Sequence, residues 1–403
     1  MALSLASNLA HAPPVNGLYS FVIHPLIYAI LGSCPLLVVG PEAAGSLLMG
    51  AIVKTSVSQG ESGEDNSMEC AIVIGTATAM TGAMILVAGV TRLGFLDNVL
   101  SRPFLRGFIT AIGFVIFVDQ LIPELGLAAQ AKEAGVSHAA TVEKLSFIIH
   151  HASQCHTLTA VVSLVSFVII MLFRYEGCLI PLGFISDTHV INRQLKKFLV
   201  PRFPHVIYFP DRFLVVVLSA ILAWRLSWEE KGLQLLGHTE ISSSQLFAFQ
   251  WPFQFSHMKH VRTAMSKAFI ITLLGFFESS VAAKSLDEKP DGIQGMHISP
   301  NREMVALGVA NFLGGCFMAL PAFGGYGRSK LNCQTGGRTP MSSVFISIIT
   351  LVCILVLLPY LYYLPVCVTL HPLEVVFGRE TMLTSQTESG SLLNDIGCRL
   401  FSC

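Results

Sequence analysis

The amino-acid sequence predicts an all-α, multi-pass membrane protein that folds as an inverted repeat around two broken helices. Hydrophobic residues make up 53% of its 403 residues and charged residues only 12%, whereas soluble domains carry about 25% charged residues. The mean hydropathy is +0.65. Two short apolar segments interrupted by Gly and Pro, residues 38–50 and 320–332, lie far apart in the chain. Such a pair, at corresponding places in two halves, is typical of the binding site of an inverted-repeat transporter.

The first broken segment joins an extended apolar run to a short helix. Pro41 fixes its own φ and lacks an N–H, so it suits a first helical turn and disfavours helix before it. The helix that follows reaches only to about Thr55, which is shorter than the roughly 20 residues that cross a hydrocarbon core. The second segment repeats this pattern, and its helix is predicted to start at Gly325. Both segments are therefore predicted to be half-helices.

The remaining apolar stretches are predicted to cross the membrane as helices. Residues 70–90 are rich in Gly, Ala and Thr, small residues that let membrane helices pack closely. Ser299 and Pro300 form a predicted N-cap with proline at the first helical position. Asp119, near the end of its span, is interpreted as an interface marker. The predicted spans are residues 18–37, 70–90, 107–122, 157–173, 213–224, 264–283, 305–320 and 342–358, with polar loops at 56–69, 124–156 and 174–212.

The distribution of Lys and Arg predicts the orientation of the chain. The segments 92–106 and 174–212 hold three and six Lys or Arg residues, whereas the segments 55–69 and 124–156, predicted on the opposite side, hold none and two. Cytoplasmic loops carry the excess of positive residues, so the basic segments are predicted to be cytosolic. The spans alternate in this way only if each half-helix crosses the membrane together with a short extended piece.

Composition argues against several other classes of function. The net charge is zero, which leaves no electrostatic footprint for nucleic-acid binding. The ten cysteines form no Cys-x-x-Cys pair and have no histidine at metal-binding spacing, so they are interpreted as buried thiols, with neither a disulfide framework nor a metal site. The histidines at 150, 151 and 156 are interpreted as solvated loop residues. No nucleophile, base and acid share one element, so neither an enzyme nor a cofactor is predicted.

Several runs of residues resemble the sulfate permease (SulP) family, in its fungal type, and they occur in the family's order. They are APPVNGLYSF at 12–21, VGP at 39–41 with SLL at 46–48, RLGFL at 92–96, NREMVALGVAN at 301–311 and GGRT at 336–339. The resemblance implies a fold of fourteen transmembrane segments in two inverted sets of seven. It also implies a core domain that binds substrate and a gate domain.

On this resemblance, residues 1–368 form a partial transporter domain, with the core at 1–91 and 264–358 and the gate at 92–225. The front half of the first transmembrane helix, the last gate helices and the family's cytosolic STAS domain are expected to be missing from the chain. Residues 369–403 resemble no part of the family and are expected to form a polar tail.

The predicted substrate-binding site lies where the two half-helices start. A helix N-terminus presents free N–H groups and about half a positive charge, so it attracts anions. The resemblance implies an anion pocket at this place and matches its arginine to Arg328. Ser46, Ser329 and Asn332 are predicted to add hydrogen-bond donors. The other predicted substrate contacts are Glu42, Ala43, Gly325, Tyr326 and Gly327, and anion carriers of the family usually have serine at the positions of Gly325 and Gly327.

Glu42 conflicts with a plain anion site. A carboxylate in the first turn would itself satisfy the helix N-terminus and would repel a dianion. At about 4 Å and an effective dielectric near 20 the repulsion is roughly 4 kcal/mol per unit charge. Three interpretations follow for Glu42: it pairs with Arg328 or Lys330 and neutralises them, it couples transport to protons or binds a cation, or it has no role.

Glu278 lies inside a predicted span. Intramembrane carboxylates face a cavity or a partner and are functional by default, and the family has an acid on this helix that is linked with proton coupling in some members. Proton coupling is therefore the prediction for Glu278. A structural pair with Lys284 is the alternative, although a spacing of six residues suits it poorly.

The sequence thus predicts a secondary active transporter of inorganic anions, with sulfate as the first candidate, that works by alternating access. A proton-coupled carrier of a cationic solute such as a basic amino acid is one alternative, and an inactive membrane remnant is another. The expected partners are the lipid bilayer, the transported anion or solute, protons and, from the family, a second copy in a homodimer. The plasma membrane and the vacuolar membrane both stay open as its location.

Overall fold

The computed structural model describes most of the chain but not all of it. The described residues are 3, 5–10, 12–57, 66–95, 114–115, 117–118, 120–134, 136, 141–175, 211–228, 231–233, 235, 247–254, 258–287, 298–357, 363–365 and 367. They fall into two compact units. The first combines residues 1–117 with 238–362 and 373–403, and the second combines residues 118–237 with 363–372.

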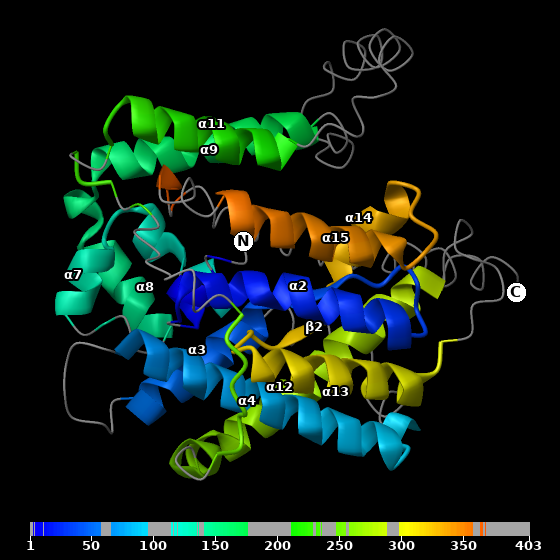
Figure 1. Ribbon diagram of the computed structural model, residues 1–403. Helices are drawn as coiled ribbons and strands as arrows, with labels where there is room; N and C mark the ends of the chain where they lie inside the picture. The colour runs from blue at the N-terminus through cyan, green and yellow to red at the C-terminus, as the bar shows by residue number, and fades with distance from the viewer. Residues whose placement is uncertain are drawn as a thin grey trace, which may run out of the picture. The chain divides into compact units, whose positions relative to one another are not determined.

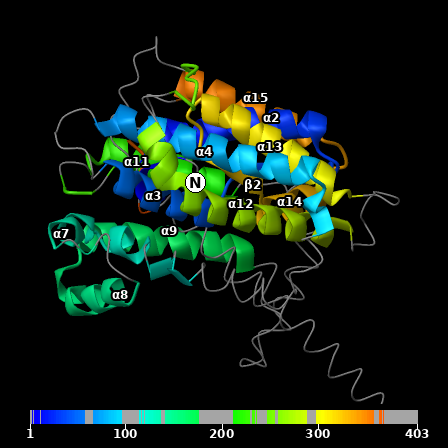
Figure 2. The same ribbon diagram turned by 90° about the horizontal axis from the view of Figure 1, so that it is seen from below.

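The first unit is a bundle of helices around a small buried sheet. Helices α2, α13, α4 and α12 run side by side, and α15 lies along α2 (Figures 1 and 2). The first half of the chain supplies η1 (Leu5–Leu9), α2 (Pro14–Leu31), β1 (Val39–Pro41), α3 (Ala43–Val57), α4 (Asn66–Val90) and η2 (Leu93–Phe95). The second half supplies α12 (Met258–Asp287), α13 (Pro300–Cys316), β2 (Ala322–Gly324), α14 (Tyr326–Gln334), α15 (Met341–Val352) and η8 (Cys353–Leu357).

The order of elements in this unit repeats. The series α2, β1, α3, α4 is followed later in the chain by α13, β2, α14, α15, so that each series runs helix, strand, short helix, helix. The two strands pair antiparallel, with Gly40 opposite Phe323, as a two-fold axis between two inverted copies requires. Helix α3 has 15 residues and α14 has 9, both short of the roughly 20 residues of a full span. The two predicted half-helices are therefore present, each behind a three-residue strand.

Helices α4 and α13 approach each other through glycines. Gly75, Gly82 and Gly89 are seven residues apart on α4, and a Cβ added at Gly82 would lie 2.2 Å from the backbone N of Phe312. Gly308 faces back, since a Cβ there would lie 2.6 Å from the backbone N of Leu86. Small residues at such crossings let two membrane helices touch backbone to backbone. The small residues of α4 predicted close packing, and the helix against which they pack is α13.

The second unit is built from shorter helices. It contains α7 (Ala128–Glu133), α8 (Thr141–His150), η4 (Ala152–Gln154), α9 (Thr157–Tyr175) and α11 (Asp211–Arg225). Phe147 and Ile148 of α8 pack in one apolar cluster with Val118, Ile122 and Leu127. In a second cluster, Ala223 and Trp228 pack with Leu233 and residues of α9.

The prediction of a polar loop at 124–156 is wrong. This segment contains α7, α8 and η4, because its apolar residues recur on one face of a helix and bury against the cluster just described. His150 ends α8, and His151 precedes η4, with its ring stacked on Phe147. His156 precedes α9 and lies 2.8 Å from the hydroxyl of Thr159. These histidines belong to helix ends rather than to a loop.

Other boundaries differ more modestly from prediction. Helix α2 begins at Pro14 and ends at Leu31, not at 37, because Gly32 is extended at φ −61° and ψ 157° and Pro35 disfavours helix before it. Helix α12 has 30 residues and extends past both ends of the predicted span at 264–283. Ser299 and Pro300 do begin α13, but the Ser299 side chain makes no capping hydrogen bond. The predicted helices at 157–173 and 213–224 are confirmed as α9 and α11.

Some predictions fall on residues outside the described ranges. They concern Asp119, most of the span at 107–122, most of the basic segments 92–106 and 174–212, and the tail at 369–403.

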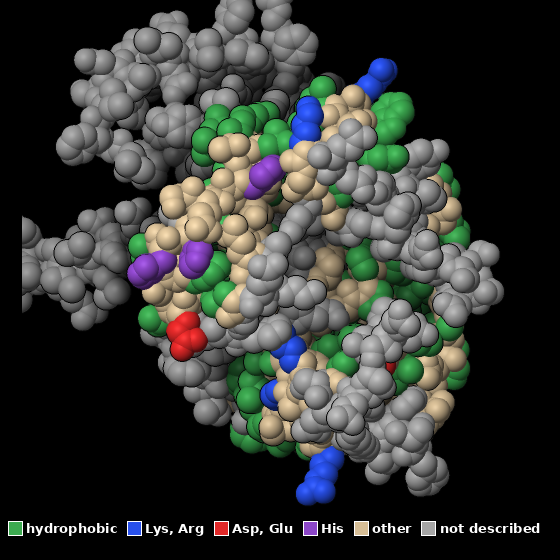
Figure 3. Space-filling view, turned by 90° about the vertical axis from the view of Figure 1, so that its left-hand side faces the viewer, with side chains coloured by type: hydrophobic (Ala, Val, Ile, Leu, Met, Phe, Trp, Pro, Cys, Tyr) green, Lys and Arg blue, Asp and Glu red, His purple; other side chains and the backbone are tan. Residues whose placement is uncertain are grey.

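Among the described residues, three helical stretches are long and apolar enough to cross a membrane, namely Pro14–Leu31, Met68–Val90 and Val261–Lys284. Large apolar side chains are also exposed along α9 and α11, for example Leu164 at 61% and Ile221 at 52%. Figure 3 shows one face on which hydrophobic side chains are abundant among those drawn in colour. Exposed apolar surface of this extent fits a lipid environment rather than water.

Candidate substrate-binding site

The site is organised by the two short strands and the helices that follow them. One residue separates each strand from its helix: Glu42 between β1 and α3, and Gly325 between β2 and α14. Both strands are buried throughout. Because the strands are antiparallel neighbours, the starts of α3 and α14 lie at the two ends of one small sheet.

The two helix starts share one pattern of hydrogen bonds. The first residues of the strands, 39 and 322, and of the helices, 43 and 326, are both 283 positions apart. This offset pairs Glu42 with Gly325 and Ser46 with Ser329. The Ser46 backbone N and Oγ donate to the Glu42 carbonyl at 2.9 and 2.7 Å, and those of Ser329 donate to the Gly325 carbonyl at 3.0 and 2.7 Å. The inverted repeat therefore extends to the hydrogen bonds of the site.

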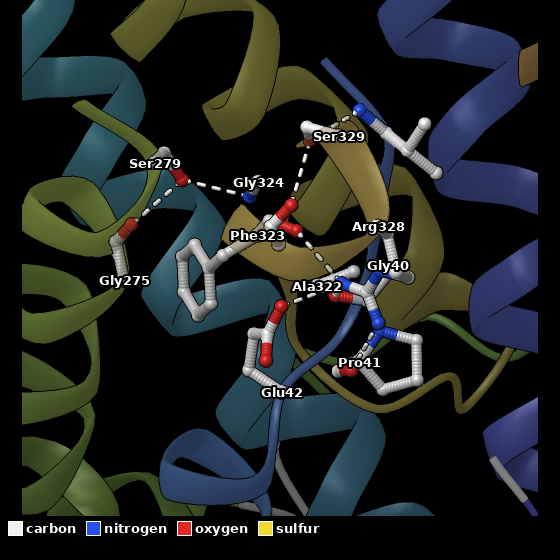
Figure 4. Close-up of polar contacts among 12 residues, drawn as sticks. Gly40, Pro41, Glu42, Gly275, Ser279, Ala322, Phe323, Gly324, Arg328 and Ser329 are labelled. Carbon is white, nitrogen blue, oxygen red and sulfur yellow. Dashed lines mark hydrogen bonds and ion pairs between the residues drawn. The ribbon is translucent and has the colours of Figure 1, made fainter. Parts of the chain in front are cut away.

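Arg328 crosses from one half of the repeat to the other. Its Nη2 donates to Glu42 Oε1 at 2.6 Å and to the Gly40 carbonyl at 3.2 Å, and its Nη1 donates to the Pro41 carbonyl at 3.0 Å (Figure 4). Its Cζ lies 5.3 Å from the centre of the Phe21 ring, within range of a cation–π contact. The first interpretation of Glu42, an ion pair with Arg328, is thus present in the structure.

Glu278 of α12 brings a third charged group to the pair. It interacts electrostatically with both Glu42 and Arg328. Its Oε2 is buried and has no hydrogen-bond partner. The Nε of Arg328 is also buried and has no hydrogen-bond partner. Buried polar atoms are normally bonded, so this acceptor and this donor are the groups beside the ion pair that a proton or a further ligand would satisfy.

Gly325 leaves the space that the ion pair occupies. A Cβ built at this position would lie 2.5 Å from Glu42 Oε1 and 2.5 Å from Arg328 Nη2. Real Cβ atoms essentially never approach other atoms so closely. A side chain at 325 would therefore force the ends of Glu42 and Arg328 to shift.

Helix α12 holds β2 from one side. The Ser279 hydroxyl donates to the Gly275 carbonyl at 2.7 Å and accepts the Gly324 N–H at 2.9 Å (Figure 4). The Phe323 ring fills the space beside Gly275, where a Cβ would lie 2.2 Å from it. These contacts fix the strand that precedes α14.

Helix α13 holds β2 through one side chain. The Asn311 amide donates to the Ala322 carbonyl at 2.8 Å and to the Leu307 carbonyl at 2.9 Å, and its Oδ1 accepts the Ala322 N–H at 2.8 Å. Asn311 is fully buried, so it replaces the sheet neighbour that Ala322 lacks on this side.

The remaining predicted contacts lie on the first turns of the two helices. Ala43 and Ser46 are buried on α3. Tyr326 and Gly327 are half-buried on α14. The Nζ of Lys330, the other cation considered for Glu42, lies 5.6 Å from the Tyr326 ring centre.

Ser329 and Asn332 contact the segment before β1. The Val38 N–H donates to Ser329 Oγ at 3.0 Å. The Asn332 amide donates to the Leu36 carbonyl and to Ser342 Oγ, both at 3.1 Å. In this conformation these polar groups tie α14 to the approach to the sheet.

Sequence reasoning missed several supporting residues. Asn311 and Ser279 are polar residues in apolar helices, and an intramembrane polar residue is a signal of this kind of role. Phe21 gave no signal, because an aromatic residue in an apolar helix is ordinary. The described residues contain no group of three His, Cys, Asp or Glu side chains that could hold a metal ion.

Comparisons with known proteins agree with this arrangement. The model of the sulfate permease family matches residues 1–385. A Saccharomyces cerevisiae protein named as a candidate sulfate transporter is 36% identical over 91% of this chain and 45% of its own length, and Arabidopsis thaliana sulfate transporter 2.2 is 26% identical over 90% and 48%. The chain thus spans about half the length of the curated relatives it matches.

Solved structures share the fold. The murine SLC26A9 anion transporter in its inward-facing state superposes with a TM-score of 0.74 at 24% identity, covering 98% of this chain and 59% of that one. The transmembrane domain of the cyanobacterial bicarbonate transporter BicA gives 0.67 at 21% identity, covering 94% and 83%. The predicted all-α membrane-transporter fold is confirmed, with the short two-stranded sheet as its only strands among the described elements. This chain is an integral, multi-pass membrane protein that belongs to the sulfate permease family, a family of transporters rather than enzymes.

Proposed function

We propose that the protein is a secondary active transporter of small inorganic anions, with sulfate as the first candidate. The observation that carries the proposal is the position of Arg328, whose guanidinium lies between the starts of two half-helices in a buried site. Helix starts and a guanidinium both favour oxyanions. Two of the relatives are named for sulfate transport.

The proposed substrate contacts are those predicted from the sequence, centred on Arg328. We propose the core domain at 1–91 and 264–358 and the gate at 92–225, with alternating access arising from motion of one against the other. The division of the chain into two compact units supports two bodies of this kind. A homodimer is part of the same proposal.

Proton coupling is proposed for Glu278 and Glu42. Glu278 has a buried oxygen without a partner, and taking up a proton would neutralise that charge beside the ion pair. A cationic substrate has less support, because the Glu42 carboxylate is bound to Arg328 rather than free to receive a cation.

Uptake into vesicles tests the proposal. The purified chain is reconstituted, and uptake of labelled sulfate and of labelled arginine is compared. Saturable sulfate uptake is expected, and Arg328→Gln should reduce it at least about tenfold because a buried charge-assisted contact is lost. Arg302→Gln is the matched control, since Arg302 lies on α13 and its Nε bonds the Leu31 carbonyl.

Two results would contradict the proposal. Arginine uptake without sulfate uptake would make the protein a carrier of cationic solutes. Uptake and binding of neither solute, together with sulfate uptake by a form extended to the length of the relatives, would make this chain an inactive remnant.

A further inference from the structure

The Glu42 carboxylate lies where the start of α14 meets Arg328. Gly325 is the N-cap residue of α14, and a Cβ there would lie 2.5 Å from Glu42 Oε1. The same oxygen accepts from Arg328 Nη2 at 2.6 Å. A helix start carries partial positive charge and attracts anions. A negatively charged side chain therefore already lies at the start of α14, bound to Arg328.

We propose that Glu42 is a tethered competitor of the transported anion, and that Gly325 is the specificity-determining residue that makes room for it. The substrate gains Arg328 only when the Glu42 carboxylate leaves it. This inference rests on the proposed transport of anions. It adds that, in the absence of substrate, the Glu42 carboxylate occupies Arg328 and competes with the substrate for it.

The charges around the pair set the direction of the effect. Among the described residues, the charged groups placed against Glu42 are Arg328 of α14 and Glu278 of α12. The charges of Glu42 and Arg328 cancel each other, and ionisation of Glu278 makes the local charge −1, which repels a dianion. Proton uptake by the Glu42 carboxylate removes one negative charge and weakens its bond to Arg328. Substrate binding should accordingly tighten as the pH falls.

The two halves of the repeat differ at the ion pair, because neither charged residue has a charged counterpart in the other half. The offset of 283 positions pairs Glu42 with Gly325 and Gly45 with Arg328. The acid comes from one half and the cation from the other, and the residue at the related position is a glycine in each case. A serine or alanine at 325 would force the ends of the Glu42 and Arg328 side chains to shift from this geometry, and removal of the Glu42 side chain would relieve one of the two collisions.

Sulfate affinity of the purified full chain tests the inference. Equilibrium binding of sulfate is measured from about pH 5.5 to about pH 8 for the wild type and for Glu42→Gln, which keeps the size of the side chain and removes its charge. We expect Glu42→Gln to bind sulfate about tenfold more tightly near pH 8 and to lose most of the pH dependence of the wild type. Glu42→Asp, whose carboxylate is one methylene further from Arg328, should lie between them.

A double-mutant cycle tests the role of Gly325. Gly325→Ala should lower the thermal midpoint of the wild type, and should lower it less in a Glu42→Ala background, because one of the two colliding side chains is gone and the other, Arg328, is released from the ion pair. Gly45→Ala is the matched control, since its added Cβ would meet nothing closer than 3.8 Å. It should show no coupling to Glu42→Ala.

The outcomes separate the inference from the function beneath it. If Glu42→Gln binds sulfate no more tightly than the wild type, or not at all, and Glu42→Asp follows the same trend, then Glu42 does not compete with the substrate. The proposal that the wild type binds anions is unaffected by that result. Additive effects of Gly325→Ala and Glu42→Ala overturn the role of Gly325. If none of the variants binds sulfate, chloride or bicarbonate, the proposed anion site itself is wrong.

Discussion

Asn311 is a single side chain on which the geometry of the site depends. Its amide satisfies both backbone groups of Ala322 in the strand that leads to α14. Asn311→Leu keeps a similar volume but leaves a buried N–H and a buried C=O without partners, each of which costs about 1–3 kcal/mol. We expect stability to fall by about 2–4 kcal/mol, measured as the thermal midpoint of the detergent-solubilised protein. Leu313→Ala, an exposed position on the same helix, should change it little, and an equal loss in both variants would contradict the role of Asn311.

Glu303 joins the end of α2 to the start of α13. Its carboxylate accepts from the Tyr28 hydroxyl at 2.6 Å, the Ser33 N–H at 2.8 Å and the Cys34 N–H at 3.2 Å, as well as from the Ser33 hydroxyl. Glu303→Ala should cost about 3 kcal/mol or more, because several buried donors lose their acceptor at once. Tyr28→Phe removes one bond and should cost about 1 kcal/mol. Thermal midpoints that fall equally in the two variants would show that the network does not act as a unit.

Some features of the individual site residues could be predicted from the sequence, and others could not. Glu42, Arg328 and Gly325 were recognisable from the broken segments and the resemblance, because charge and glycine are rare in apolar runs. The ion pair was one of three interpretations, since pairing depends on which side chains the two halves bring together. The sequence contained no sign that a Cβ at 325 would strike that pair, because this follows only from atomic positions.

At the scale of elements, the crossing of α4 and α13 depends on glycine. A Cβ at Gly82 would lie 2.2 Å from a backbone nitrogen of α13, and a backbone cannot move aside as a side chain can. Gly82→Ala should therefore destabilise the protein by about 2–3 kcal/mol. At Gly45 on α3 an added Cβ would make only ordinary van der Waals contacts, at 3.8 Å or more, so Gly45→Ala should be neutral or stabilise by about 0.5–1 kcal/mol through helix propensity. Denaturation of the two variants under identical conditions is the measurement, and a tolerated Gly82→Ala would contradict the close crossing.

Elements also show where sequence reasoning failed. Helices α9 and α11 were predicted nearly to the residue, because long apolar runs are a strong signal. Helices α7 and α8 were missed, because their polar faces lower the hydropathy and their buried faces show only when Val118 and Ile122 are placed beside them. The end of α2 was misplaced because the apolar residues 36–38 continue past the helix into the approach to β1.

At the scale of the whole molecule, the repeat explains why the site exists where it does. Two copies of helix, strand, short helix, helix meet through antiparallel strands, so that both short helices start at the same small sheet. Neither copy alone contains an ion pair at this place: Glu42 comes from the first and Arg328 from the second. The candidate site therefore forms only where the two halves meet.

The charges of the chain predict its orientation in the membrane. The segment between α3 and α4 contains no Lys or Arg at 55–69, whereas 174–212 contains six, and the positive segments are expected in the cytosol. The sequence contains no Asn-x-Ser/Thr site for N-glycosylation. A single such site, inserted on a Gly/Ser spacer, therefore shows by its glycosylation on which side of the membrane that position lies. Expressed in yeast, the protein should be glycosylated with the acceptor inserted at 58–65 and stay unmodified with it inserted at 176–200, as read from a glycosidase-sensitive shift in mobility. The reverse pattern would invert the orientation, and modification at both positions would mean that the half-helices do not each complete a crossing.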